Sequence, residues 1–249
     1  MSEDAASAKP GTLKRFYKDV SVQAVDDRFE VQLDGRGLRT PKRLPVAVLS
    51  EGVAKLVASE WRDAGALIDP QAMPVTRIVN IALDEVASHT GAIAQSAVNY
   101  LGTDTVLFRA EEPPDLVTAQ SATWDPCLAW AAERFGAQLA VSRTLAVPVL
   151  PDGLEVRVSA AAARLEPITL AAFHTAVAAS GSLILGTMLL EGALSGDAAF
   201  EAGCLEALWQ AEHWGVDPEA EAGRERIRAD LVALDALFGA MEPRPRLGI

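Results

Sequence analysis

Residues that could perform catalysis are few and widely spaced in this chain. The three histidines, His89, His174 and His213, lack the spacing of metal ligands, and a lone histidine is more often a surface or core residue. Gly35-Arg36-Gly37 begins like a dinucleotide-binding motif, but Thr40 stands at the third glycine position. The chain has no Gly-x-Ser-x-Gly nucleophile motif. The sequence therefore predicts no catalytic, cofactor-binding or metal-binding residue.

The two cysteines, Cys127 and Cys204, form no redox or metal-ligand motif. They are too few for a disulfide framework, which favours a reducing compartment. Cys127 follows Asp125-Pro126 near a predicted helix start, where a thiolate would be stabilised. A small buried hydrophobic residue is the better interpretation of Cys127.

The sequence offers instead the chemistry of a protein-binding surface, between Glu191 and Glu221. This stretch has eight acidic residues, no lysine or arginine, and two tryptophans, Trp209 and Trp214, which we expect to point in different directions on one helix. Aromatic side chains bordered by unpaired acids suit a basic or arginine-bearing protein partner. A merely solvated face explains the acids equally well, and either tryptophan could belong to the core. The candidate partner-binding residues are Glu206, Trp209, Gln210, Glu212, Trp214 and Asp217.

A β-rich region lies far upstream of this surface. Phe29, Val31 and Leu33 alternate with polar residues, as in a half-buried strand, and residues 20–25 form a preceding apolar segment. Asp34-Gly35 between this strand and the next segment predicts a hairpin turn. Ser50 predicts the N-cap of a helix that ends near residue 64.

The pattern beyond residue 77 is that of helices, with apolar residues three and four positions apart. We expect helices over residues 169–179, 182–194, 198–214 and 218–238, and a loop with a short hairpin over residues 143–158. The uncharged stretch 173–190 is too polar for a membrane anchor, so it predicts buried helical structure and no membrane insertion. Pro243 and Pro245 predict the end of ordered structure.

These patterns predict an α+β fold with a small N-terminal β-rich domain followed by a larger, mainly α-helical domain. The chain has 249 residues, half of them hydrophobic, which allows one or two globular domains. We expect a disordered tail over residues 1–13, a β-rich domain with one or two helices over residues 14–80, and the α-helical domain over residues 81–242.

The charge of the chain excludes one class of partner. The net charge is −12, and the second part of the chain carries most of it: residues 111–249 have nine basic and 20 acidic residues. Proteins that bind nucleic acids or anionic membranes neutralise phosphates with lysine and arginine. We therefore expect no nucleic-acid partner.

Several short motifs, in order over residues 14–240, resemble the family of assembly chaperones for the alpha subunit of the ATP synthase catalytic head. The resemblance implies the two-domain fold expected above, a free alpha subunit as partner, and no nucleotide, metal or catalytic residue. In that family adjacent acids often precede an aromatic-glutamine pair; here only Glu206 takes that position. The matching motifs are Arg15-Phe16-Tyr17-Lys18, Leu33-Asp34-Gly35-Arg36, Thr40-Pro41, Glu60-Trp61, Ile68-Asp69-Pro70, Met73-Pro74-Val75-Thr76, Ala82-Leu83-Asp84, Tyr100, Thr103-Asp104, Gln120, Trp124-Asp125-Pro126, Trp209-Gln210 and Trp214-Gly215.

Three functional hypotheses follow. The first is a non-catalytic, monomeric chaperone that keeps the free alpha subunit from aggregating before it assembles with beta; with neither a signal peptide nor a presequence at the start of the chain, the expected location is a bacterial cytoplasm. The second is a small-molecule hydrolase or transferase with a site between the two domains. The third is an adaptor for another basic protein. Residues 137–166 match the family weakly, and no role is expected from them.

Overall fold

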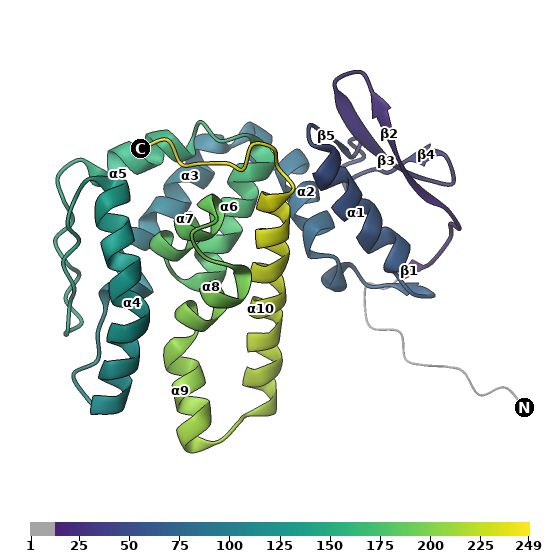
Figure 1. Ribbon diagram of the computed structural model, residues 1–249. Helices are drawn as coiled ribbons and strands as arrows, with labels where there is room; N and C mark the ends of the chain where they lie inside the picture. Colours follow the sequence, from purple (N-terminus) through teal and green to yellow (C-terminus); the bar gives the residue numbers. More distant parts are fainter. Residues whose placement is uncertain (1–12) are drawn as a thin grey trace, which may run out of the picture.

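The computed structural model describes residues 13–249, which form a β-rich part and a larger helical part, as predicted (Figure 1). The tail predicted over residues 1–13 lies outside the described residues except for Leu13. That residue begins strand β1 (Leu13–Lys14), which pairs antiparallel with β6 (Leu67–Ile68).

The predicted hairpin forms the centre of the β-rich part. Strand β2 (Val20–Val25) pairs antiparallel with β3 (Arg28–Leu33), and β3 also pairs with the short strands β4 (Arg36–Gly37) and β5 (Ala47–Val48). Asp34 and Gly35 both adopt positive φ, 48° and 74°, which is the conformation that a tight hairpin turn requires. The Asp34 carboxylate stabilises this turn by accepting hydrogen bonds from the backbone N–H groups of residues 18 and 19.

Helix α1 (Glu51–Asp63) covers one face of this sheet. Its N-cap is Ser50, as predicted, with the hydroxyl accepting from the Val53 N–H at 3.3 Å. The helix buries Val53, Ala54, Val57 and Ala58 against the strands. These apolar side chains form one stripe at helical spacing, so the period in the sequence explains which face is buried.

Helix α2 (Pro74–Asp84) connects the two parts and packs against α1, α6 and α10. Its first turn is held by Glu60 of α1, whose carboxylate accepts from the N–H groups of Val75 and Thr76, both at 2.7 Å. The domain boundary expected between residues 80 and 81 falls inside this continuous helix.

The helical part is built around two apolar helices, α6 and α7, which the others surround. Nearly every residue of α7 is buried, because this helix has apolar residues around its whole circumference. No helix within residues 13–249 is long and apolar enough to cross a membrane. The bounds are α3 (Thr90–Val98), α4 (Pro114–Phe135), α5 (Leu154–Ala162), α6 (Pro167–Ser180), α7 (Leu183–Glu191), α8 (Gly196–Gly203), α9 (Leu205–Trp214) and α10 (Pro218–Gly239), with short 3₁₀ turns at Pro70–Ala72, Val86–Ser88, Asn99–Thr103 and Thr105–Leu107.

The single helix expected over residues 198–214 is wrong: the chain forms two helices that meet at Cys204. A Cβ on Gly203 would lie 2.8 Å from the backbone oxygen of Ser180, so only glycine allows the end of α8 to approach α6 this closely. The break redirects the following residues toward α4. Helix α9 therefore starts in a direction that sequence periodicity alone does not give.

The expected end of order at Pro243 and Pro245 is also wrong. Arg244 donates to the carbonyl oxygens at the end of α7 and pairs with Asp235 of α10 at 2.7 Å. Leu247 is fully buried, and its N–H donates to Glu191 at 2.9 Å. Helix α10 ends before both prolines, and polar and apolar anchors then fix the chain across the helical part.

Candidate partner-binding site

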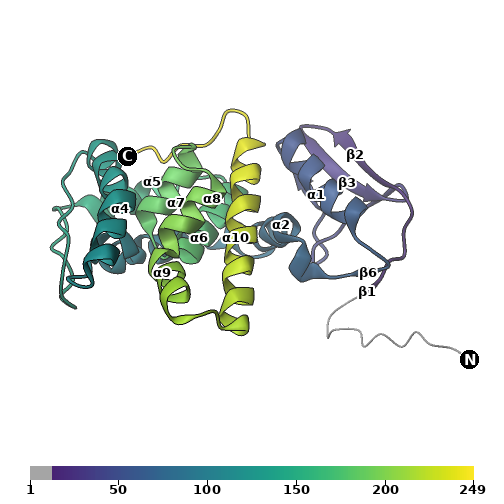
Figure 2. The same ribbon diagram turned by 60° about the horizontal axis from the view of Figure 1, so that its bottom comes forward.

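The candidate residues gather on α9 and on the turn that joins it to α10, at one end of the helical part. Figures 1 and 2 show this end projecting away from the strands, beside the first half of α4. Helix α9 contacts α4 and α8. Two sets of polar contacts fix it on α4, one near each end of α9.

The first set joins Glu206, in the first turn of α9, to Gln120 of α4. Gln120 Nε2 donates to Glu206 Oε1 at 2.6 Å, and Gln120 Oε1 accepts from the Ala110 N–H at 2.8 Å. Gln120 is 1% exposed, and a buried amide has to satisfy both of its ends. Glu206 itself is exposed, and no described residue donates to its Oε2. Its carboxylate is thus held in one orientation with an oxygen available to a donor from another protein.

The second set joins Trp209 and His213 to Asp115 in the first turn of α4. The indole and imidazole rings stack with 4.0 Å between centroids, and Trp209 Nε1 donates to Asp115 Oδ2 at 3.1 Å. His213 Nε2 lies 3.2 Å from the same oxygen, and His213 Nδ1 lies 2.8 Å from the Trp209 carbonyl oxygen. Both of these partners are hydrogen-bond acceptors, so each can take a bond from a protonated ring nitrogen.

Asp115 supplies the negative charge in this cluster. Loss of water contacts opposes its ionisation, but the hydrogen bond from Trp209 and the positive charge of His213 lower the pKa of Asp115 overall. The sequence analysis did not identify Asp115. The only signal for Asp115 was its position in the first turn of a helix. Acids are common there because they interact favourably with the helix dipole, so this position does not indicate a binding role.

Trp214 ends α9 and is the most exposed aromatic residue of the described chain, at 74%. The rings of Trp209 and Trp214 meet edge to face with 5.6 Å between centroids, although Trp209 bonds Asp115 of α4 and Trp214 is exposed to solvent. Val216 in the following turn is also exposed. An indole left this exposed in a folded chain provides apolar area that a partner can cover.

The other candidates differ in how they are engaged. Asp217 is the N-cap of α10 and accepts from the Glu219 N–H at 2.9 Å, so this residue has a structural role beside its charge. Gln210 and Glu212 are exposed and contact no polar group of the described residues. The structure thus brings all six candidates to one end of the molecule.

Fewer acids of the stretch from Glu191 to Glu221 are unpaired than the sequence suggested. Three of its eight acids pair with arginines from outside the stretch, whose positions the sequence alone does not give. Glu206, Glu212 and Asp217 are not among the three, and they have no cationic partner within residues 13–249. The pairs are Glu191 with Arg134, Asp197 with Arg228, and Glu221 with Arg224.

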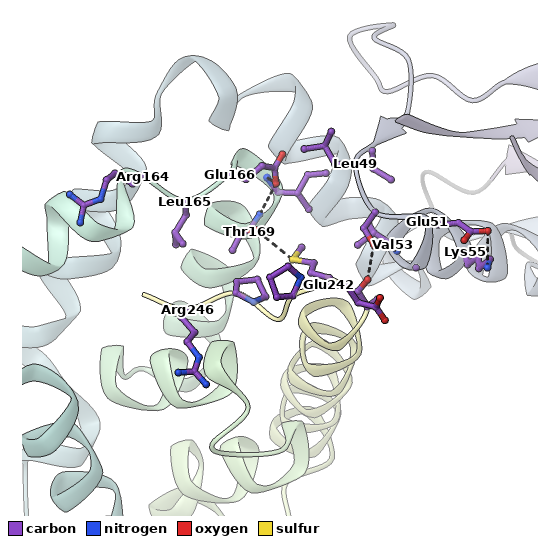
Figure 3. A pocket seen from close by; sticks show the side chains of 18 residues that line it. Leu49, Glu51, Val53, Lys55, Arg164, Leu165, Glu166, Thr169, Glu242 and Arg246 are labelled. Atoms are coloured by element: carbon purple, nitrogen blue, oxygen red, sulfur yellow. Dashed lines mark hydrogen bonds and ion pairs between the residues drawn. The ribbon is translucent and has the colours of Figure 1, made fainter. Parts of the chain in front are cut away.

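A cavity of ≈ 710 Å³ lies where the β-rich and helical parts meet, the place expected for an enzyme site (Figure 3). Its lining contains no histidine, cysteine or aspartate. Of its acids, Glu51 pairs with Lys55 and Glu166 caps α6. No convergent acid–base pair is present among these lining residues.

The acids with raised pKa lie elsewhere and act as helix caps. Burial raises the pKa of Glu60, although hydrogen bonds from Thr76 and Val75 oppose the shift. Burial raises the pKa of Asp104 to about 6, and Asp104 accepts from the N–H groups of Val106 and Ile184. Residues 13–249 contain no group of three or more His, Cys, Asp or Glu placed to hold a metal ion.

The chain is similar to known chaperones over most of its length. The model of the ATP12 chaperone protein family matches residues 14–132. The mitochondrial Atp12 protein of Schizosaccharomyces pombe is 26% identical over 255 residues, with 97% of this chain and 88% of that protein covered.

Two crystal structures of bacterial proteins are also similar. Atp12 from Paracoccus denitrificans is 34% identical with a TM-score of 0.83, covering 91% of this chain and 97% of that one. A protein from Agrobacterium tumefaciens is 36% identical with a TM-score of 0.84, covering 91% of this chain and 85% of that one. The chain therefore belongs to the ATP12 family of chaperones for ATP synthase assembly.

Proposed function

We propose that this chain is a non-catalytic, monomeric chaperone of a bacterial cytoplasm that binds the free alpha subunit of the ATP synthase catalytic head. A free alpha subunit exposes the surface that it later buries against beta. Obligate interfaces of this kind are large and apolar, so without a partner they aggregate. A chaperone that covers this surface less tightly than beta does can be displaced without an energy source.

The observation that carries this proposal is the arrangement of α9 on α4. Glu206 offers a fixed carboxylate and Trp214 an exposed indole, and one set of polar contacts near each end of α9 fixes this helix on α4 before any partner arrives. Pre-organised side chains lose little conformational entropy on binding. Fixed acids beside an aromatic anchor fit an arginine-bearing apolar surface.

The proposal is tested with charge and aromatic variants of this face. We expect Glu206→Lys and Trp214→Ala to weaken binding of purified alpha subunit at least about tenfold, as removal of an interface anchor does. Asp217→Asn keeps the capping oxygen of α10 while removing the charge, so it separates the two roles of that residue. The readouts are the dissociation constant and the light scattering of alpha held at its aggregation temperature.

Glu133→Lys is the matched control, because it makes the same change in net charge at an exposed acid about 20 Å further along α4. Equal binding by the wild type, Glu206→Lys and Trp214→Ala would refute this face as the site. Failure of the wild type to bind alpha at all would refute the proposed function.

A further inference from the structure

The loop between α4 and α5, residues 136–153, is a second surface that the proposed function leaves unused. It lies at the outer edge of the helical part, on the side away from the strands, in both Figures 1 and 2. Loops of this length without secondary structure of their own usually have a function or lack order. This one is fixed: Ser142 donates to the Leu107 carbonyl and accepts from the Arg109 N–H, both at 2.8 Å, and Pro148 is buried.

Around Pro148 the loop exposes apolar side chains. Leu145 is 100% exposed and Val149 87%, the two highest values among the large apolar residues of the described chain, and Val147 is 59% exposed. Chains usually keep such residues scattered rather than alternating along one segment. The fixed loop therefore presents a short apolar stripe to solvent.

The backbone of this stripe is also unpaired. No described residue bonds the N–H or the C=O of Val147 or of Val149. Pro148 and Pro151 disfavour helical conformations at Val147 and Leu150, and the chain runs without a bend over residues 147–150. In such a chain residues two apart, here Val147 and Val149, direct their polar backbone groups to the same side. That side offers two donors and two acceptors, whereas the opposite side lacks a donor at Pro148.

We propose that residues 147–149 are a docking edge, along which an extended apolar segment of the free alpha subunit adds as a β-strand. The added strand bonds the N–H and C=O groups of Val147 and Val149 and covers the side chain of Leu145. Residues 136–151 contain no acid and only one base, Arg143, in an otherwise acidic region. The docking edge thus suits an uncharged strand, unlike the acidic face of α9. The identity of the partner rests on the proposed function.

The test compares dissociation constants for purified alpha subunit. We expect the triple variant Leu145→Ser, Val147→Ser, Val149→Ser to bind at least about tenfold more weakly. Val147→Pro keeps an apolar side chain but removes a donor of the docking edge, so it should weaken binding by a similar factor. Val156→Ser, at a 72% exposed valine on α5, is the control and should stay within about twofold of the wild type.

Each other outcome overturns the inference. Unchanged binding by the triple variant, while Glu206→Lys binds weakly, overturns the docking edge and leaves the proposed function standing. Unchanged binding by Val147→Pro overturns strand addition. Dimerisation of the wild type that Val147→Pro abolishes, with alpha binding unaffected, assigns the edge to a second copy of this chain. Failure of the wild type to bind alpha overturns the proposed function and this inference with it.

Discussion

Replacing Gln120 by leucine should loosen α9 from α4 without opening a cavity, since the two side chains have similar volumes. The partly buried Ala110 N–H then loses its acceptor, which costs about 1–3 kcal/mol. The bond to the exposed Glu206 carboxylate contributes about 1 kcal/mol more. The apolar leucine side chain is more favourable than glutamine in this buried position, which offsets about 1 kcal/mol of the lost stability. We expect the free energy of unfolding to fall by about 2 kcal/mol.

Urea denaturation followed by tryptophan fluorescence and circular dichroism measures this change. A double-mutant cycle with Glu206→Ala isolates the contact between the two side chains, and we expect a coupling energy of about 1 kcal/mol. Gln120→Leu with wild-type stability, or a coupling energy of zero, would refute the reasoning that this buried amide positions Glu206.

Three further predictions concern the helical core. Glu191→Ala should lower the free energy of unfolding by about 3–5 kcal/mol in urea, because it leaves the half-buried Arg134 without its paired carboxylate; a loss below about 1 kcal/mol would contradict this. Gly186→Ala should lower stability by about 1–3 kcal/mol in the same assay, since its Cβ would lie 2.6 Å from Val177 Cγ2, and a stabilised variant would show that α6 and α7 separate freely. Burial raises the pKa of Asp104 to about 6 in the folded chain, above the unfolded value near 3.8. The folded chain therefore binds a proton at Asp104 more readily than the unfolded chain does, and the ionised Asp104 destabilises the fold most above pH 6. The stability of the wild type relative to Asp104→Asn should therefore rise by up to about 3 kcal/mol as the pH falls from 7 to 4, and a pH-independent difference would contradict the burial argument.

Local patterns in the sequence predicted the individual elements well. The alternation of Phe29, Val31 and Leu33, the Asp34-Gly35 turn and the Ser50 cap depend on neighbours within a few residues, and all three formed as expected. The two-part α+β architecture was also correct. Such features are encoded by backbone preferences and by the period of burial, both visible in one sequence.

The errors arose where distant residues meet. The break at Cys204 depends on the close approach of Gly203 to Ser180. The docked C-terminal segment depends on Arg244 and Glu191, which are more than 50 residues apart. No local pattern reports these contacts.

The candidate site was predicted only in part, because it too depends on contacts between distant residues. Glu206, Trp209 and Trp214 stood out by type and spacing on one short segment. Asp115 and the anchoring role of Gln120 required knowledge of which helix lies beside α9, and that neighbour is about 90 residues upstream. Likewise, nothing in the sequence distinguished Leu145, Val147 and Val149, which the structure shows exposed.

The central claim is that this chain shields the free alpha subunit until beta replaces it. Purified alpha mixed with the chain and analysed by size-exclusion chromatography with light scattering tests this most directly. We predict a soluble complex with one copy of each protein, which disappears when beta is added and releases the chain as a monomer. Aggregation of alpha at the same rate with and without the chain, or a complex that beta cannot displace, would contradict the account.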